Sequence, residues 1–365
     1  VYKRQVLEFM ADFGERILGK GIVWAKDTPN FIGNRIGVQG IVKAMQLMVE
    51  EKITIAEVDA LFGTAMGRPK TAMFKTADLV GLDVLGHVAD NTYALVKDDE
   101  ARQDFVLPEF VKTMIEKGLL GKKSQSGFYK TDLTPEWKKI RKVIDPATLD
   151  YQELERPDLP GVTAARKAET LPEKIRAVVY GKDRTSQYAW KVLAINLIYS
   201  ANRIPEIADT IVEIDNAMRW GFNFELGPFG TWDAIGLQES VAKMDADGLP
   251  VPEKIRAMIA AGHTCFYKTE NGQQLYYDFS SGRYEPIQTS ANIVSLSALK
   301  GAGKAQRSGT AASLVDIGDG VFCLEFHNKM NALTHETLEM LDEALDFIDR
   351  EGVGLVIGNQ AGGVP

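Results

Sequence analysis

The sequence has few of the residues on which disulfide, metal and nucleophile chemistry depend. Among its 365 residues there are two cysteines, Cys265 and Cys323, far apart and each in an apolar context. We expect both to be reduced structural thiols, as is usual for a cytoplasmic protein. The four histidines are scattered without the spacing of metal ligands, and none accompanies a serine or cysteine in a nucleophile motif. The sequence therefore predicts no metal site and no Ser- or Cys-dependent hydrolase.

Acidic residues outnumber basic ones, and long apolar runs are scarce. The formal net charge is −8, which argues against a general surface for nucleic acid or anionic membranes but leaves room for a local anion pocket. The longest apolar candidate, "AWKVLAINLIYSA", carries Lys191 and Asn196. It falls short of the ~20 apolar residues of a membrane span and is typical of a buried helix. We expect no nucleic-acid partner and no membrane span.

Helical periodicity fills most of the remaining chain. Apolar residues recur at helical spacing from Val6 to Ile17, and glycines follow as stop signals. The next stretch, "GIVWAKD", is typical of a short strand. From Pro29 to Lys130 the pattern is again helical, and Pro29 predicts the start of a long helix because proline is favoured in a first turn.

The most informative feature is an internal repeat. Thr54–Asp83 and Thr210–Gln238 both open with Thr-Ile-x-Glu-φ-Asp, where φ is apolar, and close with Phe-x-Thr-x-Asp-φ-φ-Gly-Leu. The sequence "SGFYKT" at Ser126 is echoed by "TCFYKT" at Thr264, and a hairpin-like stretch follows each. This pattern predicts two tandem copies of one helical-plus-hairpin unit, packed as a pseudo-dimer.

The composition of the sequence changes beyond Ile287. The segment "SALKGAGKAQRSGTAAS" is small and polar and predicts a linker. Its "GAGKAQRSG" imitates part of a phosphate-binding loop, but it follows no strand and lacks the full spacing. Two strands, an amphipathic helix with Thr334 as N-cap, and a buried strand are expected next. This β-β-α-β order is typical of the beginning of an α/β domain.

Asn34 stands out because asparagine is a poor helix former one turn inside a helix. One interpretation is a buried amide that bonds a neighbouring backbone. The other is an amide presented to a site, where its donor and acceptor orient an imidazole or a substrate oxygen. Gly33 and Gly37 would let another backbone or a ligand approach beside it. Periodicity alone leaves both interpretations open.

Lys122 and Lys123 also have two interpretations. They follow a helix in "KGLLGKKSQSGFYK", where a solvated pair of cations is favoured by the helix dipole. Alternatively, they contact a phosphate or pyrophosphate. The second copy has "AAGHTCFYK" at this place, so an anion site here would belong to the first copy alone.

These residues resemble a known family. "KDTPNFIGNRIG" is similar to the signature that opens the C-terminal domain of L-3-hydroxyacyl-CoA dehydrogenases, and "GRPKTAMFKTADLVGLD" and "GKKSQSGFYK" resemble later motifs of that domain. From about Ala312, "GVFCLEFHNKMNALTHETLEMLDEAL" resembles the start of the enoyl-CoA hydratase (crotonase) superfamily. The order of the two is similar to a fused, multifunctional enzyme of fatty-acid β-oxidation, both oxidoreductase and lyase.

The resemblance implies a fold and its parts. The fold is mainly α, with two tandem 3-hydroxyacyl-CoA dehydrogenase C-terminal-type helical repeats and small β hairpins, flanked by the tail of a Rossmann domain and the first β-β-α-β elements of a crotonase domain. The expected parts are the Rossmann tail (1–28), the first repeat (29–130), a hairpin and connector (131–183), the second repeat (184–290), a linker (291–311) and the truncated crotonase domain (312–365).

The resemblance also implies roles for single residues. In the family, a His–Glu pair of the Rossmann domain transfers the proton while NAD takes hydride from C3 of the CoA thioester. Asn34 matches the asparagine that holds the histidine and the substrate oxygens, and Lys123 matches a lysine that contacts NAD. Lys329, Met330 and Ala332 match a loop that contacts CoA. The two repeats should pair within one chain, as single-copy relatives pair between chains, and further oligomerisation is left open.

The resemblance has departures that carry further expectations. No Gly-x-Gly-x-x-Gly follows a first strand, and the His–Glu pair is not found. We therefore expect an internal fragment that is inactive alone. Two other hypotheses stay open: a helical module that serves only structure or assembly, and a complete helical enzyme of another kind.

Overall fold

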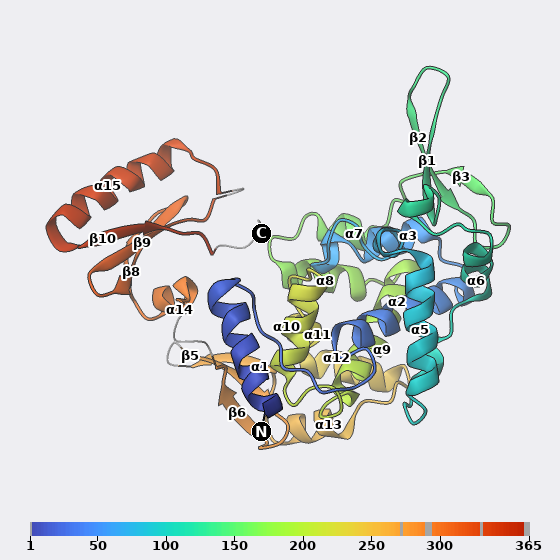
Figure 1. Ribbon diagram of the computed structural model, residues 1–365, viewed down its shortest axis with the longest axis horizontal. Coiled ribbons are helices and arrows are strands. Elements are labelled where there is room, and N and C mark those ends of the chain that lie inside the picture. The colour runs from blue at the N-terminus through green and yellow to red at the C-terminus, as the bar shows by residue number, and fades with distance from the viewer. Residues whose placement is uncertain (1, 271–272, 289–293, 329–330, 361–365) are drawn as a thin grey trace. The chain divides into compact units, whose positions relative to one another are not determined.

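The computed structural model describes residues 2–270, 273–288, 294–328 and 331–360 (Figure 1). The chain divides into two compact units, of which the first is Val1–Phe266 with Tyr277–Arg283 and the second is Tyr267–Tyr276 with Tyr284–Pro365. Helices hold 50% of the chain and strands 15%. Within the described ranges, every helix is too short or too polar to cross a bilayer.

The first unit is mostly helical, and its two longest helices, α2 and α9, pack against each other. Its helices are α1 (Tyr2–Asp12), the π-helix η1 (Phe13–Ile17), α2 (Gly33–Glu50), α3 (Ile55–Leu61), the 3-10 turn η2 (Thr64–Met66), α4 (Phe74–Val80), α5 (Leu82–Leu95), η3 (Arg102–Phe105), α6 (Glu109–Glu116), η4 (Lys122–Ser124), α7 (Pro160–Ala165), α8 (Leu171–Val179), α9 (Arg184–Asn202), α10 (Ile211–Gly221), α11 (Pro228–Ile235), α12 (Leu237–Ala246) and α13 (Glu253–Ala260).

The contact between α2 and α9 holds both polar and apolar groups. Tyr188 is fully buried and donates from its hydroxyl to the carbonyl of Ala44 over 2.8 Å. Asn196 donates to the carbonyl of Ile36 at 3.2 Å and to the Gln39 amide oxygen at 2.8 Å. Tyr188 and Asn196 therefore have partners inside the core, whereas one guanidinium nitrogen of the buried Arg35 has none among the described residues.

Helix α2 begins later than the sequence predicts. Asn30 and Phe31 have left-handed backbones, with φ of 63° and 50°, so the helix cannot start at Pro29 and starts at Gly33. The Asn30 amide donates to Thr92 of α5 and, at 3.5 Å, to the carbonyl of Val88. The turn before α2 is thus fastened to α5, a long-range contact that local helix signals do not contain.

Two small antiparallel sheets follow the two echoes of the "FYKT" sequence. One has the order β1–β2–β3, with β1 (Tyr129–Leu133), β2 (Lys139–Ile144) and β3 (Tyr151–Glu153). The other has the order β4–β5–β6, with β4 (Tyr267–Glu270), β5 (Gln273–Asp278) and β6 (Arg283–Pro286). Tyr267 pairs with Tyr276 in the second sheet, and Gly282, with φ of 68°, lies in the turn before β6. Strands therefore form in both stretches that the sequence marks as hairpins.

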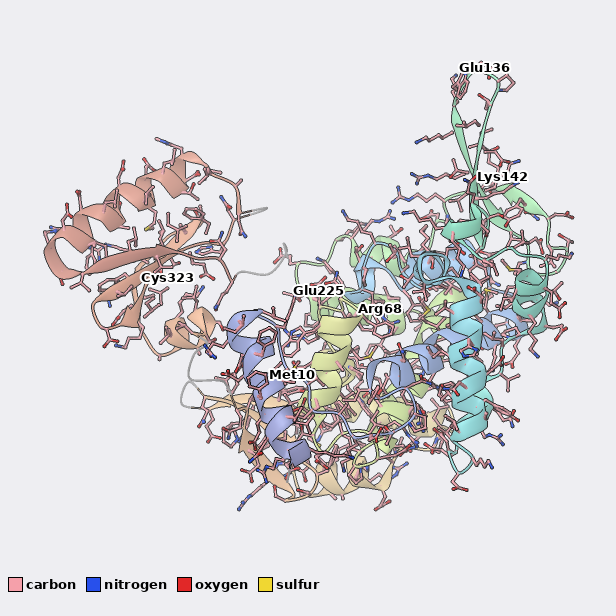
Figure 2. All side chains as sticks on the ribbon, in the orientation of Figure 1. Met10, Arg68, Glu136, Lys142, Glu225 and Cys323 are labelled. Carbon is pink, nitrogen blue, oxygen red and sulfur yellow. The ribbon has the colours of Figure 1, made fainter. Side chains whose placement is uncertain are left out.

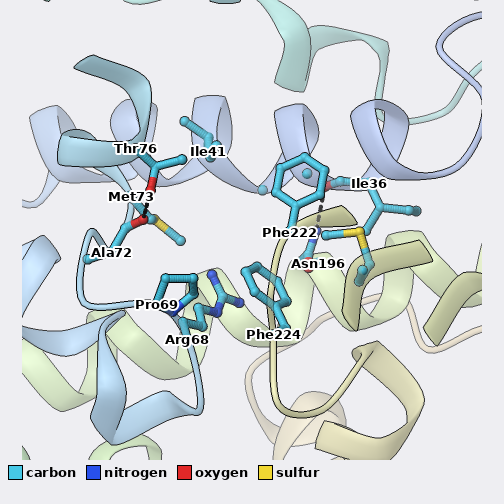
Figure 3. A pocket seen from close by; sticks show the side chains of 13 residues that line it. Ile36, Ile41, Arg68, Pro69, Ala72, Met73, Thr76, Asn196, Phe222 and Phe224 are labelled. Atoms are coloured by element: carbon cyan, nitrogen blue, oxygen red, sulfur yellow. Dashed lines mark hydrogen bonds between the residues drawn. The ribbon is translucent and has the colours of Figure 1, made fainter. Parts of the chain in front are cut away.

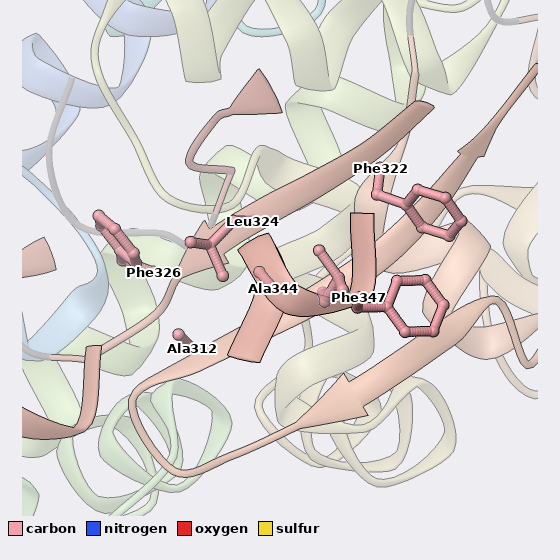
Figure 4. Close-up of a cluster of buried hydrophobic side chains, with 7 residues drawn as sticks. Ala312, Phe322, Leu324, Phe326, Ala344 and Phe347 are labelled. Carbon is pink, nitrogen blue, oxygen red and sulfur yellow. The ribbon is translucent and has the colours of Figure 1, made fainter. Parts of the chain in front are cut away.

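The second unit contains a four-stranded sheet of order β10–β9–β8–β7, covered by one long helix. Its elements are α14 (Leu296–Gly301), β7 (Ala305–Ser308), β8 (Ala312–Gly318), β9 (Val321–Phe326), α15 (His335–Glu351) and β10 (Gly354–Ile357). Figure 4 shows its core, where Leu324 and Phe322 of β9 face Ala344 and Phe347 of α15. The Phe322 and Phe347 rings meet edge to face, 5.1 Å apart.

The predicted fold class is wrong. Strands and three sheets make up a substantial share of the chain, so it is a mixed fold and not a mainly α one. Residues 21–27, expected to close a Rossmann domain as a strand, form no strand and pair with no sheet. A short apolar run is ambiguous without a partner strand to pair with, and this run has none among the described residues.

The stretch interpreted as a linker also holds regular structure. Helix α14 and strand β7 both lie between residues 291 and 311, and β7 pairs with β8. Their small polar side chains gave no periodic signal. The β-β-α-β order after Ala312 does form, but such an order recurs in many α/β folds and does not by itself define a crotonase domain.

Candidate functional site

Asn34 lies in the first turn of α2 with its side chain exposed. No hydrogen bond from its amide reaches another residue within the described part of the chain. The interpretation of Asn34 as a buried structural amide therefore does not fit, because the amide is free to meet a ligand. Its catalytic role remains a prediction.

The glycines beside Asn34 serve packing. A Cβ built on Gly37 would lie 2.4 Å from the Phe222 ring, and one on Gly33 would lie 3.3 Å from it. A Cβ on Gly40 would lie 3.0 Å from the Asn196 amide. The side chains of Phe222 and Asn196 thus pack directly on the backbone of α2, where only glycine leaves enough room.

Arg35, the neighbour of Asn34, is the centre of a buried ionic network. Its guanidinium is fully buried and contacts Asp99, Glu206 at 2.9 Å and the Tyr199 hydroxyl. Arg203 joins the same network through Asp99 at 3.1 Å. Removing one partner would leave an uncompensated buried charge, so this network specifies how α2 sits against α9.

Lys123 lies in η4, where its ammonium forms an ion pair with Asp83 at the start of α5. The hydrogen bond from Lys123 lowers the pKa of Asp83 below its ordinary value. Both side chains are close to half exposed, so a ligand can reach them. The predicted contact of Lys123 with NAD is not tested by this geometry, and Lys123 is not simply a free, solvated cation.

The "SGFYK" segment next to Lys123 is held by a buried aspartate. Asp78 accepts hydrogen bonds from the backbone N–H groups of Phe128 and Tyr129, at 2.8 and 2.9 Å. Burial raises the pKa of Asp78 to about 6. A Cβ on Gly127 would lie 2.1 Å from the Asp78 carboxylate, so the close approach requires glycine there. These parts of the recognised motif therefore have a structural role.

The structure describes only one of the three residues that were predicted to contact CoA. Lys329 and Met330 lie outside the described residues. Ala332 is exposed, and its carbonyl accepts a hydrogen bond from the Asn328 amide at 2.8 Å. A contact of these residues with CoA therefore remains a prediction.

A pocket lies beside α2 (Figure 3). Its cavity volume is about 30 Å³, and the surrounding empty space of about 450 Å³ includes open solvent. Ile36, Gly37, Gly40 and Ile41 of α2 line it, and Asn34 lies outside the lining. The opposite walls carry Arg68, Phe222 and Phe224.

The sequence motifs did not single out Arg68, Phe222 or Phe224. Arg68 stands inside the quoted "GRPK" segment, where its charge between glycine and proline was an available signal. Phe222 and Phe224 flank Asn223 in a turn with φ of 55°, and nothing local connects them to α2. Among the described residues, no group of three or more His, Cys, Asp or Glu side chains is arranged to hold a metal ion.

Comparison with known proteins places this site in a family context. Residues 31–131 match the profile of the family described as "3-hydroxyacyl-CoA dehydrogenase, C-terminal domain". This range contains Asn34, Lys123 and Arg68. The first part of the chain is therefore similar to the helical C-terminal domain of a dehydrogenase class.

Relatives extend the similarity over nearly the whole chain. A "Probable 3-hydroxyacyl-CoA dehydrogenase" of Bacillus subtilis is 43% identical over 355 residues, which is 97% of this chain and 44% of that protein. One of the same description from Deinococcus radiodurans is 52% identical over 126 residues, 34% of this chain and 36% of that protein. The chain thus spans less than half the length of these curated relatives. Over nearly its whole length, the chain is similar to part of a protein described as a probable 3-hydroxyacyl-CoA dehydrogenase.

A solved structure gives a weaker likeness. The crystal structure of 3-hydroxybutyryl-CoA dehydrogenase from Escherichia coli K12 aligns with a TM-score of 0.46 and 18% identity, over 71% of this chain and 66% of that one. Similarity at this level does not define a shared fold. The findings do not support the predicted fusion to an enoyl-CoA hydratase, nor the predicted status of the chain as an inactive fragment.

Proposed function

We propose that the chain supplies the substrate-facing helical part of an NAD-dependent 3-hydroxyacyl-CoA dehydrogenase. The observation that carries the proposal is the exposed amide of Asn34, in the first turn of α2 and within the residues that match the family. Gly37, one turn further along the helix, lines the pocket. An acyl-CoA whose reacting carbon lies at Asn34 would extend its acyl chain along this side.

Oxidation at C3 benefits from a neutral hydrogen-bond donor to the reacting oxygen, and the amide of Asn34 is such a donor. The reaction removes the proton of the C3 hydroxyl and a hydride from C3, so the hydroxyl oxygen becomes a carbonyl oxygen. An amide N–H donates to this oxygen throughout, and the amide has no proton of its own to lose. When bound, NAD supplies the acceptor for the hydride.

Lys123 is the residue that we propose to contact NAD. It is exposed, Lys122 beside it is exposed as well, and its partner Asp83 holds the ammonium near the first turn of α5. A cation held in this way fits a phosphate, and the carboxylate beside it fits a ribose hydroxyl. Both groups are accessible without a change in the core.

The proposal is tested by substituting Asn34 in a protein that joins this chain to an NAD-binding domain. We expect Asn34→Ala to lower kcat for 3-hydroxyacyl-CoA oxidation by about 10²–10³, as does the loss of one preorganised donor elsewhere. NADH formation gives the rate, and thermal unfolding shows whether the fold persists. Asn91→Ala, which removes an exposed asparagine on α5, is the matched control and should leave kcat unchanged.

Two results would contradict this assignment. If kcat of Asn34→Ala stayed within about threefold of the unsubstituted protein, Asn34 would not contact the reacting groups. The alternative of a non-catalytic assembly module would then gain support. If Asn34→Ala instead lost its cooperative unfolding, the residue would be structural.

A further inference from the structure

The pocket beside α2 contains a cation that has no anionic partner. The guanidinium of Arg68 lies between two aromatic rings, with its carbon 5.0 Å from the Phe62 centroid and 4.7 Å from the Phe224 centroid. Figure 3 shows it beside Phe224, within the pocket. Within the described part of the chain, no carboxylate forms an ion pair with Arg68 and no acceptor bonds its guanidinium.

Arg68 is partly exposed, so its guanidinium meets water on one side and apolar groups on the other. The apolar surroundings lower the pKa of Arg68 to about 10, and the side chain is still charged at neutral pH. Contacts with the ring faces recover only part of the lost hydration of a cation. An unpaired charge in such surroundings gains most from a ligand of opposite charge.

The other polar side chains of the pocket are already satisfied. Asn196 donates to the Ile36 carbonyl and to Gln39, and the Thr76 hydroxyl donates to the Ala72 carbonyl at 2.7 Å. The rest of the lining is predominantly apolar, with Ile41, Met73, Met218 and Phe222 among its residues. Along the described lining, Arg68 is therefore the group left to bind a polar ligand atom.

Arg68 and Phe224 come from segments that are remote in the sequence and meet in the pocket wall. The guanidinium carbon lies 4.7 Å from the centroid of the Phe224 ring. The ring therefore contacts the cation without neutralising its charge.

We propose that the pocket binds an apolar chain that ends in a carboxylate, and that Arg68 forms the ion pair with this carboxylate. The identity of the chain rests on the proposed function: with the reacting carbon at Asn34, the chain is the acyl group of the substrate. The substrate class is then a 3-hydroxyacyl-CoA whose acyl chain has a carboxylate at its far end. Ile41, about 10 Å along the helix from Asn34, marks the direction of this chain.

Glu225 is the competing partner for Arg68. Its backbone N–H donates to the Gly67 carbonyl at 2.8 Å, so it lies beside Arg68 (Figure 2). Its side chain is exposed and makes no ion pair with Arg68 in the structure. If Glu225 were the true partner, its removal would matter as much as the removal of Arg68.

Binding of free probes tests the pocket without any catalysis. We would titrate the chain with octanoate and with 1-octanol by calorimetry, because the two probes differ mainly in the terminal charge. Arg68→Met keeps the length of the side chain and removes the charge. We expect octanoate affinity to fall about tenfold to a hundredfold and octanol affinity to stay within about threefold. Equal losses for both probes, or no loss for octanoate, would overturn the proposal.

Control variants keep this result interpretable. Glu225→Gln should leave octanoate binding unchanged or tighter, whereas a loss equal to that of Arg68→Met would assign the pair to Glu225 and overturn the proposal. Arg68→Lys should keep part of the octanoate affinity because it keeps the charge. If Arg68→Met does not fold, Arg68→Gln, which also removes the charge, takes its place in the same titration.

Turnover then tests the substrate class. In a protein that joins the chain to an NAD-binding domain, kcat/KM should favour the carboxyl-terminated 3-hydroxyacyl-CoA over the methyl-terminated one of equal length. Arg68→Met should reverse this preference, and an unchanged preference would contradict the assignment. If neither substrate is oxidised, the proposed function fails, while the octanoate titration still decides whether Arg68 binds a carboxylate.

Discussion

Thr54 and Thr210 open the two copies of the motif, 156 residues apart, and both act as helix N-caps. Asp59 and Asp215 lie at the same offset, and each accepts a backbone hydrogen bond from a phenylalanine, Phe74 at 2.7 Å and Phe229 at 2.9 Å. The repeated polar residues of the motif therefore have the same structural task in both copies.

The second aspartate of each copy binds the echo of the "FYKT" sequence. Asp78 accepts from the backbone of Phe128, and Asp233 accepts from the backbone of Phe266 at 2.7 Å. The two parts of the sequence repeat, far apart along the chain, thus meet through one carboxylate in each copy. This pairing explains why the aspartate and the "FYKT" segment occur together.

The two copies differ in the helix that precedes each motif. In α2, Asn34 is exposed in the first turn and Arg35 is buried beside Asp99. In α9, the first turn contains Thr185 and Ser186, which are buried and donate from their hydroxyls to Asp183. The framework that the copies share is therefore structural, and an exposed amide opens the helix in the first copy.

The largest expected effect is on the network around Arg35. Arg35→Met should lower the free energy of unfolding by up to about 3–5 kcal/mol, because Asp99 would lose one of the two buried arginines that compensate its charge. By comparison, Lys191→Met on α9 should cost about 1 kcal/mol or less, since its ion pair with Glu51 is partly exposed. Urea unfolding of both variants measures the difference. Similar losses would mean that the buried network contributes no more than a partly exposed ion pair.

The next effect is a pH dependence from Asp78. Burial raises its pKa to about 6 in the folded chain, whereas the ordinary pKa of this carboxyl group is 3.8. The folded state therefore holds the proton more tightly than the unfolded state. The stabilisation from this proton is present at low pH and is lost as pH rises from about 4 to 6, by about 3 kcal/mol at most. Asp78→Asn should remove this part of the pH dependence. An unchanged profile in the variant would refute the assignment to Asp78.

A smaller effect is expected where the two "FYKT" segments differ. Gly127→Ala should cost about 1–3 kcal/mol, because its Cβ would meet the Asp78 carboxylate and the Gly121 backbone. The residue before Phe266 in the second copy is Cys265, so a side chain is tolerated there. Cys265→Ala should change stability by about 1 kcal/mol or less. Thermal unfolding of the pair checks this, and a neutral Gly127→Ala would contradict the close contact.

Much of the helical structure could be predicted because its signals are local. Thr54 and Glu57 form the capping box that opens α3, and the turn chemistry at Gly282 predicts the second hairpin. The start of α2 could not be predicted, because it depends on the left-handed Asn30 and on its contacts with α5. The predicted strand at residues 21–27 was wrong for a related reason, since a strand needs a partner that the local sequence does not specify.

The candidate site was predicted in part. Asn34 and Lys123 could be named from motifs, and the structure places both where a ligand can reach them. The pocket could not be named, because its walls come from segments that are remote in sequence, such as Gly37 and Phe222. Gly37 was expected to leave room for a backbone or ligand, and the room is taken by an aromatic ring of the same chain.

The contact of Phe222 with Gly37 also fixes the rotation of α2 about its own axis. Rotating α2 about its axis by one residue, about 100°, would turn the side chain of Ile36 or Val38 toward the ring in place of a bare backbone. The helix therefore has one rotational setting that the ring accepts. Because Asn34 belongs to the same helix, its direction is fixed by the same contact. A single aromatic ring, 188 residues away in the chain, thus sets the direction in which the exposed amide points.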